Sequence, residues 1–398
     1  MRLLFVVDGR SPTAINWIRY FTDQGYEVHL ASTFACNPEI QLASQTLIPA
    51  AFSQMKNTGQ KAGQAGFLRR RLWGRTAVGL RTAVRQWLGP LTLPAAAKVL
   101  AENIRKINPD LVHAMRIPYE GMLAALAQQR LAKAGFPHPT LLVSVWGNDF
   151  TLHARSNPWM GYFTRLTLQT ASALHTDCRR DQRLAREWGF PDDKPAIVLP
   201  GGGGIQMDLF QPPLQEAETP TVINPRGIRA YVRNDAFFRA IPLILEGQPK
   251  TRFLCPTMAG EPESLGWLDR LGIAGSVELL PRQTRPQMAE LFRRSQVAVS
   301  PSTHDGTPNT LLEAMACGCY PVAGDIESLR EWIDPAENGS LVDPGSPAEL
   351  AQAVLQALAD PQLRRRAAAR NRQLVAERAD YRRVMPQAVE FYKKIGLA

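Results

Sequence analysis

Short apolar runs alternate with segments of helical length along most of the chain. Residues 2–7 (RLLFVV) have the pattern of a buried strand, residues 12–25 that of a helix, and residues 27–32 (EVHLAS) that of a second strand. The same pattern predicts further strands at residues 110–114, 140–147, 172–176 and 196–200. Apolar strands separated by helices are typical of parallel sheets, because each parallel connection crosses over a face of the sheet. Residues 1–200 therefore predict one doubly wound α/β domain.

A glycine- and proline-rich stretch interrupts this alternation. Residues 201–220 begin with four glycines and continue into prolines, and we interpret them as an interdomain linker. Strand-like runs then return at residues 221–225, 251–256, 276–281, 296–301, 320–324 and 339–344. Residues 221–376 predict a second doubly wound domain, and residues 377–398 continue as arginine-rich helical sequence. Two such domains imply a central cleft, with ligands at the carboxyl ends of the strands.

The composition fits a globular protein of the cytoplasm. Of the 398 residues, 45% are apolar and only 21% are charged, which excludes a disordered chain. The apolar run Leu3–Val7 ends at Asp8, so the start of the chain predicts neither a membrane-spanning helix nor a signal for export. Five scattered cysteines argue against a disulfide framework and for a reducing compartment.

The positive charge is concentrated in one part of the chain. Residues 40–101 contain nine lysines and arginines and no acidic residue, against a net charge of +10 for the whole chain. A helical wheel places tryptophans on one side of this segment and arginines on the other. One interpretation is a helix lying in an anionic lipid interface, and the other is a core-packed helix with a solvated arginine face. No nucleic-acid motif accompanies the charge, so nucleic acid is not an expected partner. The candidate membrane residues are Arg70, Arg71, Trp73, Arg75, Arg81, Arg85 and Trp87.

Residues 301–325 carry the strongest chemical signal. A strand leads into a loop with Gly306 and Pro308, and a helix is predicted to start near Asn309, with Thr307 or Asn309 as its cap. Free backbone N–H groups at such a helix start bind anions. The carboxylates of Asp305 and Glu313 can accept hydrogen bonds from the hydroxyls of a sugar and a ribose.

Cations precede this segment at the end of the first strand of the second domain. Arg226, Arg229 and Arg233 offer planar guanidinium groups for a diphosphate. Arginines, a phosphate-binding helix start and two carboxylates together predict a nucleotide-sugar site.

These motifs resemble retaining glycosyltransferase family 4. The family's donor motif has two acidic residues separated by seven others, then Ala and a Gly-x-Pro-Val pattern, and it matches Asp305, Glu313, Ala314, Gly318, Pro321 and Val322. Residues 110–114, 146–149, 201–212 and 225–227 also resemble family patterns. The resemblance implies the GT-B fold, with an N-terminal acceptor domain, a C-terminal donor domain and a final helix that crosses back to the first domain.

The resemblance also implies roles for single residues. Arg226, Arg233, Asp305 and Glu313 would be catalytic, with Arg229 as the alternative to Arg233 for the diphosphate. Other donor contacts would come from Gly227, Pro281, Arg282, Gly306, Thr307, Pro308, Asn309 and Thr310. Acceptor contacts would come from Arg10, Ser11, Arg116, Glu120, Asn148 and Asp149. The chain departs from the family pattern at Asp305, where Glu is usual, and at Met115, where a histidine is common.

The predicted activity is transfer of a hexose-type sugar, with retention, from a UDP- or GDP-linked donor to a glycan or lipid-linked acceptor. No cofactor is expected, and the absence of an Asp-x-Asp pair predicts that no metal is needed. A nucleotide-sugar 2-epimerase of the GT-B type and a non-catalytic sugar-nucleotide-binding relative are the alternatives. Turnover of the donor distinguishes the three. The chain is expected in the cytoplasm, with the anionic membrane face as a candidate partner.

Overall fold

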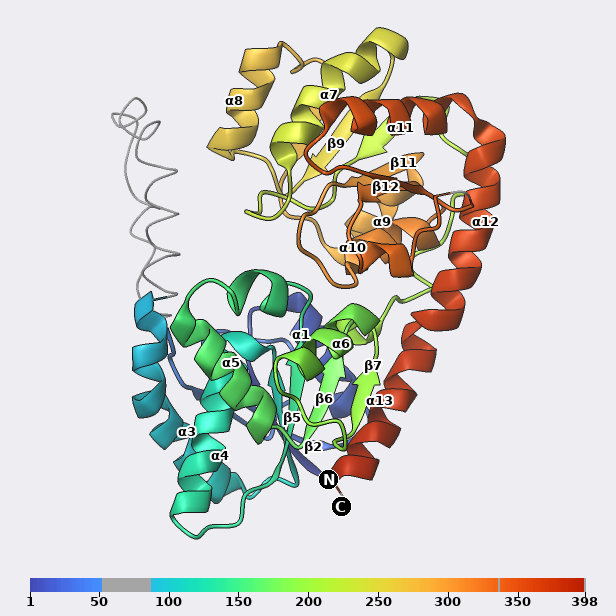
Figure 1. The fold of residues 1–398 in the computed structure, drawn as a ribbon. Helices are drawn as coiled ribbons and strands as arrows, with labels where there is room; N and C mark the ends of the chain where they lie inside the picture. The colour runs from blue at the N-terminus through green and yellow to red at the C-terminus, as the bar shows by residue number, and fades with distance from the viewer. Residues whose placement is uncertain (52–86, 336, 397–398) are drawn as a thin grey trace. The chain divides into compact units, whose positions relative to one another are not determined.

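The computed structural model describes residues 1–51, 87–335 and 337–396 (Figure 1). Contacts between Cα atoms divide the chain into two units, each with its own sheet and core. The first unit consists of Met1–Asp177, Asp181–Val198 and Ala388–Ala398, and the second of Cys178–Arg180 and Leu199–Gln387.

A parallel seven-stranded sheet forms the centre of the first unit. Its strand order is β3-β2-β1-β4-β5-β6-β7. The strands are β1 (Arg2–Val7), β2 (Glu27–Ser32), β3 (Ser44–Leu47), β4 (Leu111–Met115), β5 (Thr140–Val145), β6 (Ala173–Thr176) and β7 (Ala196–Val198). The six strands predicted for this part of the chain are confirmed. The sequence pattern did not predict β3, because its four residues SQTL are mostly polar and lie at the sheet edge.

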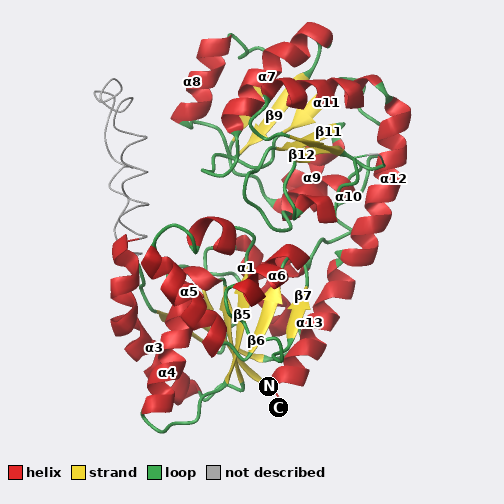
Figure 2. Cartoon of the chain, in the orientation of Figure 1, coloured by secondary structure: helices red, strands yellow, loops and turns green. Residues whose placement is uncertain are grey.

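Helices cover both faces of this sheet (Figure 2). They are α1 (Pro12–Asp23), α3 (Leu93–Ile107), α4 (Met122–Lys133), α5 (Pro158–Thr170), α6 (Arg179–Glu187) and the end of α13 (Tyr381–Gly396), with the short turns η2 (Gly89–Thr92), η3 (Ile117–Gly121) and η4 (Asp149–His153). The apolar side of α3 is buried at Leu93, Leu100 and Ile104, which explains its position against the sheet.

The C-terminal residues are part of the core of the first unit. Tyr392 of α13 is 1% exposed and stacks on Phe21. Its hydroxyl accepts a hydrogen bond from Trp17 Nε1 at 2.9 Å and also bonds to Nδ1 of His113 in β4. His113 Nε2 is 2.7 Å from Ser144 Oγ. Burial holds the pKa of His113 well below its usual range, so the ring is neutral. His113 is thus a buried, neutral histidine of β4.

The second unit has a six-stranded parallel sheet of order β10-β9-β8-β11-β12-β13. Its strands are β8 (Thr221–Ile223), β9 (Arg252–Pro256), β10 (Val277–Leu280), β11 (Val297–Ser300), β12 (Tyr320–Gly324) and β13 (Ser340–Val342), all at predicted positions. Its helices are α7 (Asn234–Gly247), α8 (Pro262–Leu271), α9 (Arg285–Arg293), α10 (Asn309–Ala316), α11 (Pro347–Ala359) and α12 (Pro361–Arg378), with turns η5 (Gly201–Gly203) and η6 (Leu329–Glu331).

The strand order brings distant loops together at the carboxyl ends of the strands. In the second unit β8 pairs with β11, although more than seventy residues separate them. In the first unit β1 pairs with β4, and β4 with β5. The strand order reverses between β8 and β11 in the second sheet and between β1 and β4 in the first, and doubly wound folds bind ligands at such reversals. In the part of the chain that the structure describes, no helix is long and apolar enough to cross a bilayer.

Candidate active site

An arginine and a carboxylate from two neighbouring strand ends form the centre of the site in the second unit. Arg226 follows β8, and Asp305 follows β11. Arg226 Nη2 donates to Asp305 Oδ2 at 2.5 Å, and its Nη1 donates to Thr310 Oγ1 at 3.1 Å. The side chains of Arg226 and Asp305 are 6% and 14% exposed. The structure thus brings together three of the predicted donor residues. Arg226 follows β8 and Asp305 follows β11, on either side of the strand-order reversal, and Thr310 lies in α10.

Two asparagines hold the loop that carries Arg226. Asn224 Oδ1 accepts a hydrogen bond from the backbone N–H of Arg226, and Asn224 Nδ2 donates to Asn234 Oδ1 at 3.0 Å. Asn234 Nδ2 in turn donates to the carbonyl of Gly227. Gly227 has φ +64°, a left-handed conformation that favours glycine. Sequence reasoning missed Asn224 and Asn234, because a single asparagine before a turn gives no signal of this partnership.

The start of α10 lies beside Arg226. The helix begins at Asn309, its N-cap is Pro308, and no side chain caps it. The predicted cap at Thr307 or Asn309 is therefore wrong. Thr307 Oγ1 instead accepts a hydrogen bond from Trp332 Nε1 at 3.1 Å, which ties the loop to the turn at η6. The first backbone N–H groups of an uncapped helix carry partial positive charge that an anion can neutralise.

Several buried polar atoms near the end of β11 lack a hydrogen-bond partner. They are Arg226 Nε, Ser300 Oγ, Ser302 Oγ and Asn309 Oδ1. Buried polar atoms are nearly always satisfied in folded proteins, so these four atoms have bonding capacity left for a polar ligand. Gly306 in the same loop is buried, and the Ser328 hydroxyl donates to the carbonyl of Asp305 at 2.7 Å.

Glu313 lies one turn into α10 and is 9% exposed. Burial raises its pKa to about 7, and the positive charge of Arg285 opposes this shift. Arg285 Nη2 lies 3.7 Å from Glu313 Oε1. Arg285 begins α9, 28 residues before Glu313 in the sequence, and no motif in the sequence links the two residues. The pair joins the first residue of α9, the helix that follows β10, to α10, the helix that follows β11.

The other two candidate arginines, Arg229 and Arg233, bond to groups other than Asp305. Arg233 Nε and Nη2 each donate to Asp235 at 2.8 Å, so its guanidinium is committed to that carboxylate. Arg229 donates to the carbonyl of Arg226 and to the Tyr231 hydroxyl. Neither arginine bonds to Asp305. Pro281 and Arg282 follow β10 and are exposed.

The first unit has its own cluster of charged groups at the end of β4 and β5. Arg116 Nη2 donates to Asp149 Oδ1 at 3.2 Å, and Asp149 Oδ2 accepts from the N–H groups of Ile117 and Trp146. Asp149 is 1% exposed, and burial raises its pKa while the charge of Arg116 opposes the shift. Arg116 has φ +119°, a strained backbone for a residue with a side chain. Strain held in place by an ion pair to a buried carboxylate marks this turn as a candidate ligand-binding element.

The remaining candidate acceptor residues surround this pair or serve the fold. Glu120 is 2% exposed and accepts a hydrogen bond from Thr33 Oγ1 at 2.7 Å. Arg10 pairs with Asp8 and lies 3.5 Å from the centre of the Phe34 ring. Ser11 is the N-cap of α1, where its hydroxyl accepts from the Ala14 N–H. Asn148 precedes η4 and is half-buried.

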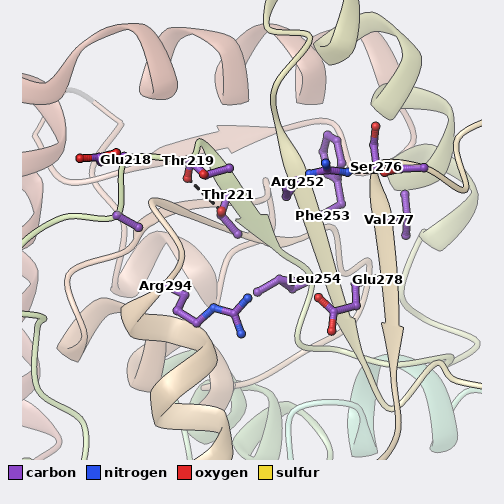
Figure 3. A pocket seen from close by; sticks show the side chains of 12 residues that line it. Glu218, Thr219, Thr221, Arg252, Phe253, Leu254, Ser276, Val277, Glu278 and Arg294 are labelled. Carbon is purple, nitrogen blue, oxygen red and sulfur yellow. Dashed lines mark hydrogen bonds between the residues drawn. The ribbon is translucent and has the colours of Figure 1, made fainter.

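A cavity of about 660 Å³ lies at the opposite edge of the second sheet. Residues at the amino ends of β8, β9 and β10 line it, and Figure 3 shows Thr221, Arg252 and Glu278 together with Arg294 of the loop after α9. The two arginines and two glutamates that line the cavity are all exposed. The cavity is therefore separate from the residues around Arg226, which lie at the carboxyl ends of the same strands.

One group of described residues has atoms close enough to share a metal ion. Ligand atoms of Asp177, Cys178 and Asp181 lie within 4.8 Å of one another, and all three residues are buried. Each takes part in other interactions, and we assign no metal to them. Of the candidate membrane residues, only Trp87 lies within the described part of the chain; Arg70, Arg71, Trp73, Arg75, Arg81 and Arg85 lie outside it.

Comparisons with protein families match most of the chain. The model "Glycosyl transferase 4-like domain" matches residues 9–201, and the model "Glycosyl transferases group 1" matches residues 215–374. The chain belongs to the family 4 type of glycosyltransferases, with an α/β fold of the GT-B type.

Curated relatives are similar over part of their length. A D-inositol 3-phosphate glycosyltransferase from Thermomonospora curvata is 31% identical over 214 residues, which are 47% of this chain and 49% of the relative. The enzyme of the same name from Thermobispora bispora is 24% identical over 270 residues, 63% of this chain and 57% of the relative. The match thus spans about half the length of these relatives.

Solved structures agree with the fold over nearly the whole chain. Sucrose-phosphate synthase from Thermosynechococcus elongatus has a TM-score of 0.72 at 16% identity, covering 99% of both chains. HepE from Anabaena, solved in complex with UDP, has a TM-score of 0.70 at 15% identity, covering 99% of this chain and all of its own. At these identities the likeness establishes the fold alone.

Proposed function

We propose that the chain is a glycosyltransferase that takes a hexose-type sugar from a nucleotide diphosphate donor, with UDP as the first candidate. The observation that carries this proposal is the position of Arg226, held between Asp305 and Thr310 beside the uncapped start of α10. Arginine and free helix N–H groups suit a diphosphate. The family relatives named above are glycosyltransferases, and HepE from Anabaena was solved with UDP.

The roles of the residues follow from what each can donate or accept. Arg226 and the N–H groups at the start of α10 would bind the diphosphate and stabilise the negative charge that develops as the sugar–phosphate bond breaks. Asp305 would accept hydrogen bonds from sugar hydroxyls, and Glu313 from the ribose. Arg285 would keep Glu313 available in its charged form.

The stereochemistry and the lack of a metal are parts of the same proposal. With Arg226 on the leaving diphosphate, cationic side chains take the role that a divalent metal has in other transferases. Transfer would retain the anomeric configuration, with the acceptor attacking from the face that the diphosphate leaves. The leaving phosphate would take the proton of the acceptor hydroxyl as the new glycosidic bond forms.

The acceptor is proposed to be a glycan or a lipid-linked sugar that binds the first unit. Arg116, whose side chain is 26% exposed and is held by the buried carboxylate of Asp149, supplies a guanidinium suited to hydroxyl groups. Arg10 over the Phe34 ring adds a flat surface at the neighbouring strand end.

The test is a product assay with UDP- and GDP-sugars and a panel of glycan and lipid-linked acceptors. The proposal predicts release of nucleotide diphosphate only with acceptor present, unchanged rates in a chelator such as EDTA, and retained configuration in the product by NMR. Isomerised donor without acceptor would indicate a 2-epimerase instead. Unchanged donor with tight nucleotide binding would indicate a non-catalytic relative.

A further inference from the structure

The residues on either side of η6 donate hydrogen bonds to the loop that carries Asp305. Ser328 Oγ donates to the carbonyl of Asp305 at 2.7 Å, and Trp332 Nε1 donates to Thr307 Oγ1 at 3.1 Å. We call residues 305–308 the donor loop. Ser328, Trp332 and Thr307 are all buried. Loss of either bond therefore leaves a buried polar group without that partner, which is more costly than the loss of a bond at the surface.

The backbone of the donor loop depends on bonds from other segments. Gly306 lies at its centre, and glycine has the greatest freedom in φ and ψ of all residues. Neither Asp305 nor Gly306 donates a backbone–backbone hydrogen bond in the described part of the chain. On the side of the proposed donor site, Asp305 Oδ2 accepts from Arg226 Nη2 at 2.5 Å. The bonds from Ser328 and Trp332 hold the same loop from its other side.

The Ser328 hydroxyl has a fixed direction because it takes part in a second bond. Arg180 Nη1 donates to Ser328 Oγ at 3.0 Å, and Arg180 is buried. A hydroxyl has one proton to donate, and here an arginine supplies the bond that it accepts, so its proton goes to the Asp305 carbonyl. Residues Cys178–Arg180 belong to the second unit by their contacts, so all three partners lie within that unit.

Trp332 is fixed by contacts of both its ring and its backbone. The guanidinium carbon of Arg378 lies 4.2 Å from the centre of the Trp332 ring. The Trp332 carbonyl accepts from Asn338 Nδ2 at 2.9 Å, and Asn338 also donates to Asn371 of α12. Both asparagines are buried. Trp332 thus donates to Thr307 from a position that its other partners determine.

The proposed function gives the position of the donor loop a chemical consequence. Asp305 would accept hydrogen bonds from sugar hydroxyls, whereas Arg226 and the first N–H groups of α10 would bind the diphosphate. Arg226 is also held by bonds to Asn224 and Thr310. A shift of the donor loop would therefore displace the sugar-binding carboxylate and leave most of the diphosphate site in place. A misplacement of about 1 Å can lower a reaction rate about a hundredfold.

We propose that Ser328 and Trp332 are positioning residues for sugar transfer. From the two ends of η6 they hold the donor loop where the carboxylate of Asp305 meets the sugar of the donor. This proposal rests on the proposed function, because it assigns a role within the same donor site. It predicts that sugar transfer and nucleotide binding respond differently when these bonds are removed.

The test removes one hydrogen bond at a time and measures transfer and nucleotide binding separately. Ser328→Ala removes the hydroxyl, and Trp332→Phe removes the indole N–H but keeps an aromatic ring beside Arg378. Each variant should lower kcat for transfer about tenfold to a hundredfold, because the carboxylate of Asp305 is misplaced. Each should keep the wild-type affinity for the nucleotide diphosphate in calorimetry, because Arg226 and α10 remain.

Helix α8 of the same unit offers a matched control for each variant. Ser264 is fully buried, and the guanidinium carbon of Arg270 lies 4.1 Å from the ring centre of Trp267. Among the described residues, neither the Ser264 hydroxyl nor the Trp267 N–H has a hydrogen-bond partner. Ser264→Ala and Trp267→Phe should therefore transfer sugar at the wild-type rate. Thermal unfolding checks that every variant is folded at the assay temperature.

Thr307→Val removes the bond of Trp332 from its other end and replaces Trp332→Phe if that variant does not fold. The double variant Thr307→Val, Trp332→Phe should have the same kcat as Thr307→Val alone, because both changes remove one bond. Additive losses would overturn the role of Trp332. A wild-type kcat in folded Ser328→Ala or Trp332→Phe would overturn the proposal, as would a loss of nucleotide affinity as large as the loss of kcat.

These outcomes differ from a failure of the proposed function. A wild-type chain that neither binds a nucleotide nor transfers sugar would overturn the proposed function and this inference together. A wild-type chain that transfers sugar, with equal rates in Ser328→Ala and Trp332→Phe, would overturn this inference alone.

Discussion

Arg226 donates a hydrogen bond of 2.5 Å to the carboxylate of Asp305, across the point where the strand order of the second sheet reverses. The two residues are 79 positions apart, and each follows its own strand. We assign them to different parts of one donor, the diphosphate and the sugar. Their direct contact means that each sets the position and charge environment of the other, so substitutions at the two positions should not be additive.

Removal of Arg226 should affect transfer more than folding. Arg226→Ala removes a buried cation from the position proposed for the leaving diphosphate, and the transfer rate should fall about a hundredfold to a thousandfold. The control is Arg294→Ala, since Arg294 is an exposed arginine of the same unit at the opposite edge of the sheet. Both variants are compared with the wild type in the product assay. A near-normal rate for Arg226→Ala would remove this residue from the site.

The ion pair itself should be visible in unfolding experiments. Asp305→Ala leaves the guanidinium of Arg226 buried without its carboxylate, which should lower the free energy of unfolding of the second unit by about 1–3 kcal/mol. Adding Arg226→Ala to Asp305→Ala should cost less than the sum of the two single changes, because the unpaired charge is gone. Urea unfolding of the three variants and the wild type measures this coupling. Strict additivity would show that the contact has no energetic weight.

The buried carboxylate of Glu313 should make stability depend on pH. Burial raises its pKa to about 7 in the folded chain, against 4.5 when unfolded. Between these values the folded state holds a proton that the unfolded state has lost, so stability falls as pH rises through this window. Glu313→Gln removes the titration and should stabilise the chain at pH 8 by about 1–3 kcal/mol relative to wild type. The difference should disappear below pH ~4.5.

The measurement is the unfolding free energy of wild type and Glu313→Gln across this pH range. Arg285→Ala serves as a second variant, because loss of the opposing cation should move the window to higher pH. A difference between wild type and Glu313→Gln that does not change with pH would contradict the assigned titration.

The end of α13 should stabilise the first unit through Tyr392. Tyr392→Phe keeps the ring but leaves Trp17 Nε1 and His113 Nδ1 without their buried partner, which should cost about 1–3 kcal/mol. Tyr162→Phe removes the same hydroxyl from an exposed tyrosine and should leave the melting temperature unchanged. Equal melting temperatures for the two variants would mean that the hydroxyl of Tyr392 contributes nothing to this core.

Much of the fold could be predicted from periodicity alone, because parallel strands buried on both faces are nearly continuous apolar runs. Strand β3 was not predicted, because it lies at the edge of the sheet and its residues are mostly polar, so it has no apolar run. At the site, the residues in one contiguous motif, Asp305 and Glu313, could be named, and so could Arg226 in the loop after a strand.

The sequence pattern could not predict which side chains form hydrogen bonds and ion pairs with each other. Arg285 of α9 lies beside Glu313 of α10. Arg233 donates to Asp235, two residues further along the sequence, and not to Asp305. Thr307 was expected to cap α10, yet its hydroxyl accepts the bond of Trp332. Each of these contacts depends on which side chains lie close together once the sheet has formed. The order of residues in the sequence does not specify which side chains those are.

Binding of UDP to the wild-type chain and to Arg226→Ala tests the central claim most directly. Isothermal calorimetry, with a thermal-shift screen against UDP, GDP and ADP, measures it without knowledge of the acceptor. The account predicts that one nucleotide binds the wild type and raises its unfolding temperature, and that Arg226→Ala loses most of this affinity while Arg294→Ala keeps it. Absence of binding by all three nucleotides, or equal binding by wild type and Arg226→Ala, would contradict the assignment of a donor site to the end of β8 and the start of α10.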